Sequence, residues 1–364
     1  MSGTINPDKD SPGGGAKGAR QAANKAFLQR PRQTRKAQDL LHGLRDGDRG
    51  ALARALTLVE SQLPGDRAQA RKLLDACLHD RPTAVMDSFR IGITGVPGAG
   101  KSTFIEALGM HWIDQGHRVA VQAVDPSSAI SRGSILGDKT RMERLATHAD
   151  AFIRPSPARG VLGGVTDRTR EYLLLFETAG YDRLIVETVG VGQSETAVHG
   201  MVDGMLLLLV PGAGDELQGI KRGIVEMADW LVVNKADADN KVRAAETESD
   251  YRRALHLFPP TDTGWAPQVM RCSALTGEGL PHVAEALDTF RDKMLAGGHL
   301  AERRRRQAGT WLHQAINDAL TAGFYANPAV NKAVQEAEAA VLAGERHPLL
   351  AAEQLLMAFQ PKSE

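Results

Sequence analysis

Short apolar runs separated by helix-length segments fill the middle of the chain, from about Phe89 to Cys272. A parallel sheet carries helices on both faces, so its strands are apolar on both sides. Six runs fit this description, at residues 90–94, 118–124, 184–189, 205–210, 230–233 and 269–272. The pattern predicts an α/β domain over residues 89–297, with a mostly parallel central sheet flanked by helices.

Helical periodicity precedes this domain. Leu52, Leu56 and Val59 recur at the spacing of one helix face, and Asp48 can cap the start of that helix. Residues 37–88 are therefore predicted as an N-terminal helical extension. Cys77 lies on a second short apolar stripe, where we expect it to be a small core residue rather than a ligand.

The strand pattern stops after Gly298, and residues 298–364 are predicted as a C-terminal helical arm. One helix of the arm carries a wide apolar stripe that no strand remains to cover. The stripe includes Trp311, Leu312, Ile316, Leu320 and Phe324. We expect it to be buried against a second copy of the chain or against the N-terminal helices. The four arginines at 303–306 are expected to form a solvated helix face.

Residues 1–36 differ from the rest in composition. They hold eight lysines and arginines against two aspartates, with three glycines in a row at 13–15. Such a segment buries too little apolar surface to offset the entropy of ordering it. We expect a disordered solubilising tail, and the alternative is a basic arm that docks on an acidic partner.

Composition excludes several classes of protein. The 364 residues contain 44 basic and 44 acidic side chains, a balance that argues against a nucleic-acid binder. Two cysteines cannot make a disulfide framework or a four-thiolate zinc site. The longest apolar run, Met205 to Val210, is too short to cross a bilayer, and the first residues lack a hydrophobic signal core. We therefore expect a cytoplasmic protein with no nucleic-acid or membrane partner.

A phosphate loop is the strongest chemical signal. The residues Gly95-Val96-Pro97-Gly98-Ala99-Gly100-Lys101-Ser102 follow an apolar run and open a helix-length segment at Thr103. Glycines let backbone N–H groups curl round phosphates, and the helix N-terminus adds a favourable dipole. Lys101 is predicted to reach the β- and γ-phosphates, and Ser102 to bind Mg²⁺.

A second motif indicates which base the nucleotide carries. Asn234-Lys235-Ala236-Asp237 follows a predicted strand, about 130 residues beyond the phosphate loop. A carboxylate at Asp237 can accept both N–H groups of guanine's N1/N2 edge, whereas adenine presents a different edge. Ser273-Ala274-Leu275 follows another strand, where the backbone can contact the guanine oxygen. Together the two motifs predict a guanine site that holds GTP or GDP.

Two acidic residues end predicted strands on the phosphate side. Asp125 follows one strand and Glu187 ends another. Ligands of open α/β sheets lie at the carboxyl ends of strands, and carboxylate oxygens suit Mg²⁺. Helix capping is the alternative role for each. A nearby residue such as Gln193 could orient water, but the spacing does not identify it.

Two polar, glycine-bearing segments lie near these residues in the sequence: residues 131–141, between the two acidic strand ends, and residues 211–221, directly after the predicted strand at 205–210. The first is predicted as a mobile loop. Gly212, Gly214 and Gly219 would let the second rearrange, and an inert connector between strand and helix is the alternative.

These motifs together resemble one family, the methylmalonyl-CoA mutase-associated GTPases, or MeaB/ArgK group, within the SIMIBI class of P-loop NTPases. The most specific segments are Glu187-Thr-Val-Gly-Val-Gly-Gln-Ser-Glu195 and Pro211-Gly-Ala-Gly-Asp-Glu-Leu-Gln218. The resemblance runs from about Gln38 to the C-terminus. Residues 1–36 fall outside it.

The resemblance implies a homodimer held by the C-terminal helices. It also implies GTP hydrolysis coupled to protection, reactivation and cofactor loading of an adenosylcobalamin-dependent mutase. By the same carry-over, the Mg²⁺–phosphate site would comprise Lys101, Ser102, Asp125, Asp138 and Glu187. Arg141 and the segment from Asp215 to Lys221 would be nucleotide-responsive switches.

Two other functions remain open. A metallochaperone GTPase of the hydrogenase or urease maturation kind would need soft or imidazole ligands for nickel, and the sequence shows no Cys/His cluster. A kinase of a transport binding protein would use ATP, against which the Asn-Lys-Ala-Asp motif argues. The sequence does not identify the client mutase.

Overall fold

The computed structural model describes residues 36–79, 87–125, 142–157, 168–188, 194–212, 222–256 and 263–359. The chain divides into two compact units, Met1–Asp80 and Arg81–Glu364.

The first unit is helical. It contains α2 (Ala37–Arg45), α3 (Arg49–Glu60) and α4 (Pro64–His79). The predicted cap is present, because Asp48 Oδ1 accepts the N–H of Gly50 at 2.7 Å. Leu52, Leu56 and Val59 are buried on one face of α3, and Cys77 is buried on α4. The helical extension that the periodicity predicts is therefore present.

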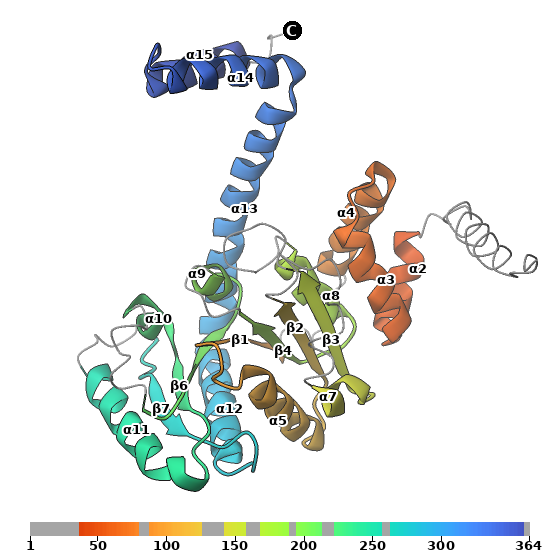
Figure 1. Cartoon of the computed structure of the whole chain (residues 1–364). Helices are drawn as coiled ribbons and strands as arrows, with labels where there is room; N and C mark the ends of the chain where they lie inside the picture. The colour runs from red at the N-terminus through yellow and green to blue at the C-terminus, as the bar shows by residue number, and fades with distance from the viewer. Residues whose placement is uncertain are drawn as a thin grey trace, which may run out of the picture. The chain divides into compact units, whose positions relative to one another are not determined.

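The second unit is built on a seven-stranded sheet with the order β3-β2-β4-β1-β5-β6-β7 (Figure 1). Every pairing is parallel, which confirms the predicted fold class. The strands are β1 (Phe89–Gly95), β2 (Val119–Asp125), β3 (Ala151–Pro157), β4 (Arg183–Glu187), β5 (Gly204–Leu209), β6 (Trp230–Val233) and β7 (Gln268–Arg271).

Strand β3 was not among the runs that the apolar pattern predicts. Its sequence, Ala-Phe-Ile-Arg-Pro-Ser-Pro, mixes polar residues with two prolines. Proline cannot donate a ladder hydrogen bond, so it is tolerated mainly at sheet edges. β3 is an edge strand that pairs only with β2, and its composition fits that position.

Helices cover both faces of the sheet, and alternate residues of β5 show the two cores. Leu206 and Leu208 pack on the face that carries α5 (Lys101–Asp114) and α12 (Leu280–Ala296). Leu207 and Leu209 pack on the face that carries α10 (Arg222–Met227) and α11 (Lys241–Leu255). Because both faces are buried, the strand reads as a continuous apolar run. The remaining elements of the domain are α7 (Glu143–Thr147), α8 (Thr169–Thr178), α9 (Ser194–His199) and the short 3₁₀ turn η4 (Ala238–Asn240).

Three helices form the last described part of the chain. α13 (His299–Ala326) is followed by α14 (Pro328–Leu342) and α15 (Pro348–Phe359), and the last two lie side by side (Figure 1). The apolar stripe of α13 is exposed, with Leu312 at 60% and Leu320 at 61% of full exposure. Its burial against a second copy of the chain stays a prediction.

The expectation that all four arginines at 303–306 form a solvated helix face is wrong for two of them. Arg305 and Arg306 are solvated as predicted, but Arg303 and Arg304 are not. Arg304 forms an ion pair with the fully buried carboxylate of Asp203, through Nε to Oδ1 at 2.8 Å and Nη2 to Oδ2 at 2.5 Å. Burial alone would raise the pKa of Asp203, but the charge and hydrogen bonds of Arg304, with a contribution from Arg90, outweigh it and hold the pKa below its usual value. A run of four arginines does not reveal which two point inward.

Replacing Arg304 with methionine should therefore lower the free energy of unfolding by about 3 kcal/mol, because Asp203 would stay buried without its partner. The matched control is Arg305→Met on the same helix, whose side chain is 74% exposed. It should change stability by less than about 0.5 kcal/mol. Chemical denaturation of the three proteins compares them, and equal losses in both variants would show that the pair contributes nothing specific.

A second buried carboxylate near α13 predicts a pH dependence. Burial raises the pKa of Asp229 to about 6, against the opposing charge of Arg303 and the N–H of Met205. The folded state then binds a proton more tightly than the unfolded chain does. Stability should therefore fall as pH rises from about 4 to about 6, by at most about 3 kcal/mol from this group.

The substitution Asp229→Asn removes the charge and keeps an acceptor for the Met205 N–H, which Asp229 Oδ2 binds at 2.9 Å. The variant should be more stable than the wild type at pH 7.5 by about 1–3 kcal/mol, and equally stable near pH 4. Denaturation midpoints measured across this pH range test the sign. A variant less stable than the wild type at pH 7.5 would contradict it.

Candidate functional site

The phosphate loop joins β1 to α5, as its sequence predicts. Gly95 and Gly100 have positive φ angles of 151° and 85°, which glycine adopts most readily. Space restricts both positions too. A Cβ on Gly95 would lie 2.4 Å from the carbonyl oxygen of Leu208, and one on Gly100 would lie 2.8 Å from Asn234 Nδ2. The glycines are thus required by the close approach of β5 and of the residue that follows β6.

Three of the predicted phosphate-side residues lie together at the end of this loop. Lys101 Nζ donates to the carbonyl oxygens of Gly95 at 2.8 Å and Val96 at 3.4 Å. Ser102 Oγ lies 3.4 Å from Glu187 Oε1, at the end of the neighbouring strand β4. Burial lowers the pKa of Lys101, while the charges of Glu187 and Glu195 act in the opposite direction. The site therefore offers a cation, a hydroxyl and a carboxylate at one edge of the sheet.

The two base-side motifs also lie side by side. Asp237 accepts a short hydrogen bond from the hydroxyl of Ser273. Ala236 N–H donates to the carbonyl oxygen of Cys272 at 3.0 Å, which holds the two segments in register. Lys235 has a positive φ of 59°, and Leu275 is 82% exposed. Strands β6 and β7 are neighbours, so their carboxyl ends bring both motifs to the same place.

Asn234 joins the base side to the phosphate side. Its Nδ2 donates to the carbonyl oxygen of Ala99 at 2.9 Å, and its Oδ1 accepts the N–H of Ala274 at 3.0 Å. The side chain is buried. The sequence identified Asn234 as part of a motif, but its contact with the phosphate loop depends on the order of the strands.

The remaining predicted residues lie at the edge of the described ranges or outside them. Asp125 ends β2 as predicted, and only its backbone is described. Asp138, Arg141, Asp215 and Lys221 lie outside the described residues, as does Gln193. Their predicted roles in metal binding and switching stay predictions.

One functional candidate was missed by sequence reasoning. Glu195 is buried and accepts a hydrogen bond from Thr94 Oγ1 at 3.3 Å. Thr94 in turn accepts one from Thr188 Oγ1 at 2.8 Å. Glu195 lies inside one of the two motifs specific to the family that the sequence resembles, but its contact with the residue before the phosphate loop required the folded chain.

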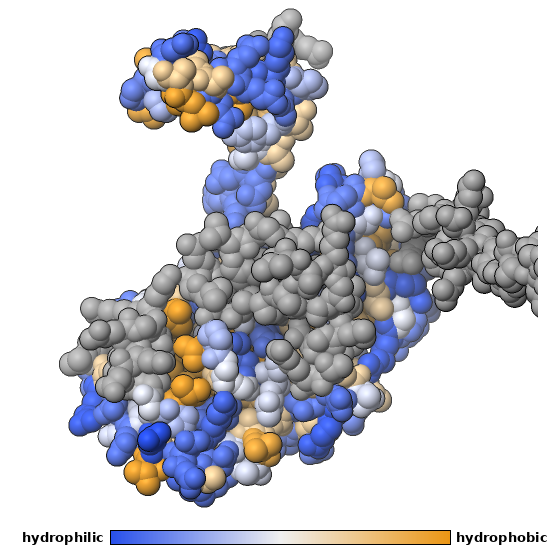
Figure 2. Space-filling view, in the orientation of Figure 1, coloured by the Kyte–Doolittle hydropathy of each residue, from blue (hydrophilic) through white to orange (hydrophobic). Residues whose placement is uncertain are grey.

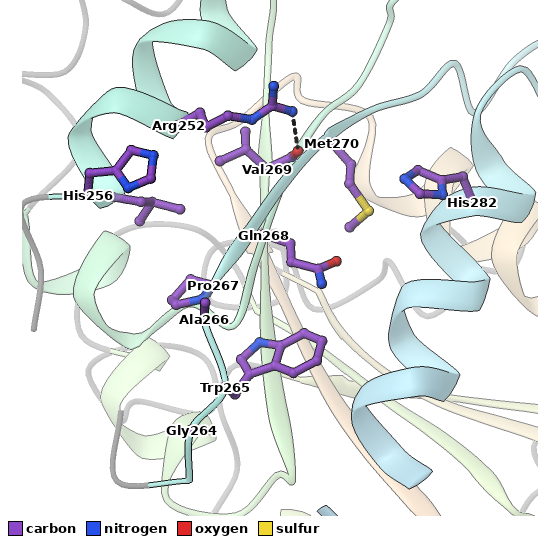
Figure 3. Close-up of a pocket in the computed structure, with 11 residues that line it drawn as sticks. Arg252, His256, Gly264, Trp265, Ala266, Pro267, Gln268, Val269, Met270 and His282 are labelled. Atoms are coloured by element: carbon purple, nitrogen blue, oxygen red, sulfur yellow. Dashed lines mark hydrogen bonds between the residues drawn. The ribbon is translucent and has the colours of Figure 1, made fainter. Parts of the chain in front are cut away.

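A cavity of about 550 Å³ lies along β7 (Figure 3). Arg252 and His256 line it from the end of α11, and His282 from α12, while Arg252 Nη2 donates to the carbonyl oxygen of Val269 at 3.4 Å. The cavity includes no residue of the phosphate loop or of the Asn-Lys-Ala-Asp motif. It is separate from the predicted nucleotide site.

Within the described ranges, no three His, Cys, Asp or Glu side chains are grouped as a metal site would need. No helix among the described residues is long and apolar enough to cross a membrane.

The parallel sheet, the phosphate loop between β1 and α5, and the Asn-Lys-Ala-Asp motif joined to that loop define a P-loop GTPase. The family model described as methylmalonyl Co-A mutase-associated GTPase MeaB matches residues 52–329. The chain belongs to this family and is a GTP-hydrolysing enzyme.

The chain is also similar to individual relatives and to a solved structure. A Caulobacter vibrioides protein described as a GTPase is 52% identical over 320 residues, covering 88% of this chain and 97% of its own. The Mus musculus protein named methylmalonic aciduria type A homolog, mitochondrial, is 46% identical over 329 residues. The match covers 89% of this chain and 79% of the mouse protein. A crystal structure of an LAO/AO transport system kinase superposes with a TM-score of 0.70 at 38% identity. The superposition covers 89% of this chain and 98% of the kinase chain.

The substitution Asp237→Asn tests the base side. An amide can donate to the C2 oxygen of xanthine but accepts poorly from guanine, so the variant should bind GDP at least about 100-fold more weakly and gain affinity for XDP. The matched control is Asp239→Asn, an exposed residue of η4. Competition against a fluorescent nucleotide measures all three proteins, and an unchanged preference for GDP over XDP in Asp237→Asn would contradict the assignment.

Proposed function

We propose that this GTPase is a chaperone of an adenosylcobalamin-dependent acyl-CoA mutase, methylmalonyl-CoA mutase in the first instance. It would protect and reactivate the mutase and control the loading of its cofactor. The observation that carries the proposal is the match of residues 52–329 to a family named for association with that mutase. The name of the mouse relative, which refers to methylmalonic aciduria, supports it.

In this proposal, separate groups of residues bind the phosphates, the guanine base and Mg²⁺. Residues 95–103 would hold the phosphates of GTP or GDP, with Lys101 against the β- and γ-phosphates. Asn234, Lys235 and Asp237, with the 273–275 segment, would hold guanine. Bound Mg²⁺ would neutralise charge that develops on the phosphates.

The donors near the loop fit that ion. Ser102 and Glu187 offer hydroxyl and carboxylate oxygens 3.4 Å apart, which is the chemistry that Mg²⁺ prefers. We assign Ser102, Glu187 and Asp125 to the metal. Asp138 belongs to the same site in this proposal, and Arg141, Asp215 and Lys221 belong to the switches, all on the strength of the family resemblance.

We further propose that the protein is a homodimer joined through its C-terminal helices. Figure 2 shows apolar surface on the C-terminal helices, and Leu349, Leu350 and Met357 of α15 are each more than half exposed. The stripe of α13 adds Leu312, Ile316 and Leu320. Exposed apolar surface of this extent is typical of an interface rather than of a solvated arm.

The two alternative functions gain no support from the described residues. A nickel chaperone needs a cluster of soft or imidazole ligands, and the described part of the chain holds no such group. A transport-protein kinase would have to use a nucleotide that the Asn-Lys-Ala-Asp motif does not fit. The cytoplasmic location and the absence of a nucleic-acid partner stay predictions.

Binding to purified mutases tests the proposed client. The full chain is mixed with methylmalonyl-CoA, isobutyryl-CoA and ethylmalonyl-CoA mutases, with GDP, a non-hydrolysable GTP analogue or no nucleotide. We expect one mutase to bind with a nucleotide-dependent affinity and to lose activity more slowly during turnover. Lys101→Ala should remove the nucleotide dependence. Binding to none of the mutases, by a chain that hydrolyses GTP, would contradict the client and leave the GTPase assignment intact.

Sedimentation tests the dimer. Replacing Leu312, Ile316 and Leu320 with glutamate places charges on the exposed stripe and should yield monomers that still bind GTP. The control places glutamates at Asn317 and Thr321, which are also exposed on α13, and should stay dimeric. A stripe variant that sediments as a dimer would place the interface elsewhere.

A further inference from the structure

An ion pair joins the two chain segments in which the base-side motifs lie. Lys241 Nζ donates to both carboxylate oxygens of Glu278, at 3.0 Å and 2.9 Å. Lys241 is the first residue of α11 and follows Asp237 closely in the sequence, while Glu278 follows Ser273. The near ends of the same two segments meet at the hydrogen bond between Ser273 and Asp237. The ion pair therefore connects their far ends.

The backbone of the second segment fixes the position of Glu278 relative to Ser273. The carbonyl oxygen of Glu278 accepts the N–H of Ser273 at 2.8 Å, which closes a tight loop. The glycines at positions 277 and 279 have positive φ angles of 81° and 78°. Position 279 also lacks space, because a Cβ there would lie 2.4 Å from the carbonyl oxygen of Arg271. The Glu278 side chain therefore starts from a backbone position that the loop itself defines.

The first segment has a backbone conformation that its residues do not favour. Lys235 and Ala238 lie on either side of Asp237 in the sequence, and their φ angles are 59° and 43°. A positive φ in a residue other than glycine costs free energy, so it persists only where surrounding contacts impose it. The ion pair supplies such a contact at the end of this segment.

The position of Lys241 does not suit its own helix. The N-terminus of a helix carries partial positive charge, so acidic residues are favoured in its first turn and lysine is not. The first turn of α11 nevertheless contains no acidic residue and begins with Lys241. A residue that breaks a local rule indicates a requirement imposed from elsewhere in the fold. The carboxylate of Glu278 is such a requirement.

We propose that Lys241 and Glu278 are positioning residues that hold the two base-side segments together around guanine and so slow the release of the nucleotide. This inference rests on the proposed guanine site at Asp237. One contact between two segments acts as a hinge, whereas a second contact farther along fixes their separation. Without the ion pair, the far ends of the segments separate more often, and bound guanine leaves more readily.

The exposure of the pair sets the size of the effect. The side chains of Lys241 and Glu278 are 55% and 61% exposed. Exposed ion pairs contribute little to overall stability, and salt screens them. We therefore expect the release rate to change severalfold, with binding retained. Most of the change should lie in dissociation rather than in association.

The first experiment measures the release of ribose-labelled fluorescent GDP from the full-length chain into excess unlabelled GDP. Glu278→Gln and Lys241→Gln should each release it about threefold faster than the wild type at low ionic strength, because each breaks the pair. The matched control is Asp250→Asn, which breaks an exposed ion pair with Arg253 within the same helix. This control should release the nucleotide at the wild-type rate.

Exchanging the two charges separates positioning from other effects of the substitutions. The double variant Lys241→Glu with Glu278→Lys restores an ion pair between the same segments, so its release rate should return to within about twofold of the wild type. Lys241→Glu alone places two carboxylates together and should release GDP at least as fast as the neutral variants. The ratio between Glu278→Gln and the wild type should shrink between about 0.05 M and about 1 M salt, because salt weakens the wild-type pair.

Unfolding of the same variants tests a purely structural role. Lys241→Gln removes a positive charge from a helix N-terminus, so it should release GDP faster without a loss of stability. Faster release that occurs only in variants with lowered stability would assign the pair to the fold and overturn the positioning role.

Two results would overturn the inference on their own. They are wild-type release from both Glu278→Gln and Lys241→Gln, and no recovery in the variant with exchanged charges. If Asp237→Asn loses its preference for GDP in the same assays, the guanine site stands and only the role of the ion pair is wrong. An unchanged base preference in Asp237→Asn would remove the guanine site, and the role of the ion pair with it.

Discussion

The buried side chain of Asn234 is the contact on which the predicted nucleotide site depends. It binds the phosphate loop at Ala99 and the segment after β7 at Ala274, while standing at the end of β6. An amide satisfied on both sides in a buried position fixes three chain segments relative to one another. Asn234 therefore joins the predicted base-binding half of the site to the predicted phosphate-binding half.

The sheet makes this contact possible. Parallel strands end at a common edge, so β1, β4, β6 and β7 deliver their following residues to one place. The same closeness explains the glycines at positions 95 and 100, where neighbouring backbone and the Asn234 amide leave no room for a side chain. Further back on β1, Gly92 makes room in the same way for the side chains of Met205 and of Val198 on α9.

Local sequence patterns were enough to predict the architecture and the motifs. Six strands follow from continuous apolar runs, and the loop, the base motif and Glu187 follow from residue chemistry placed at strand ends. Strand β3 was missed because an edge strand with Pro155 and Pro157 has no such run. The sequence did not predict that the Arg304 side chain points inward, because its partner, Asp203, lies 101 positions away and only folding brings the two together. The same reason hid Glu195, whose importance depends on a contact across two elements rather than on its neighbours in sequence.

The most direct test of this account compares two ligands of the Asn234→Ala variant by calorimetry, GDP and inorganic tripolyphosphate, each with Mg²⁺. If Asn234 joins the two halves, its loss should loosen the phosphate loop, and both ligands should bind about tenfold more weakly or worse than to the wild type. If tripolyphosphate keeps its full affinity while only GDP binds more weakly, Asn234 would be a base-side contact alone, and the claim that the site is a single unit would be wrong.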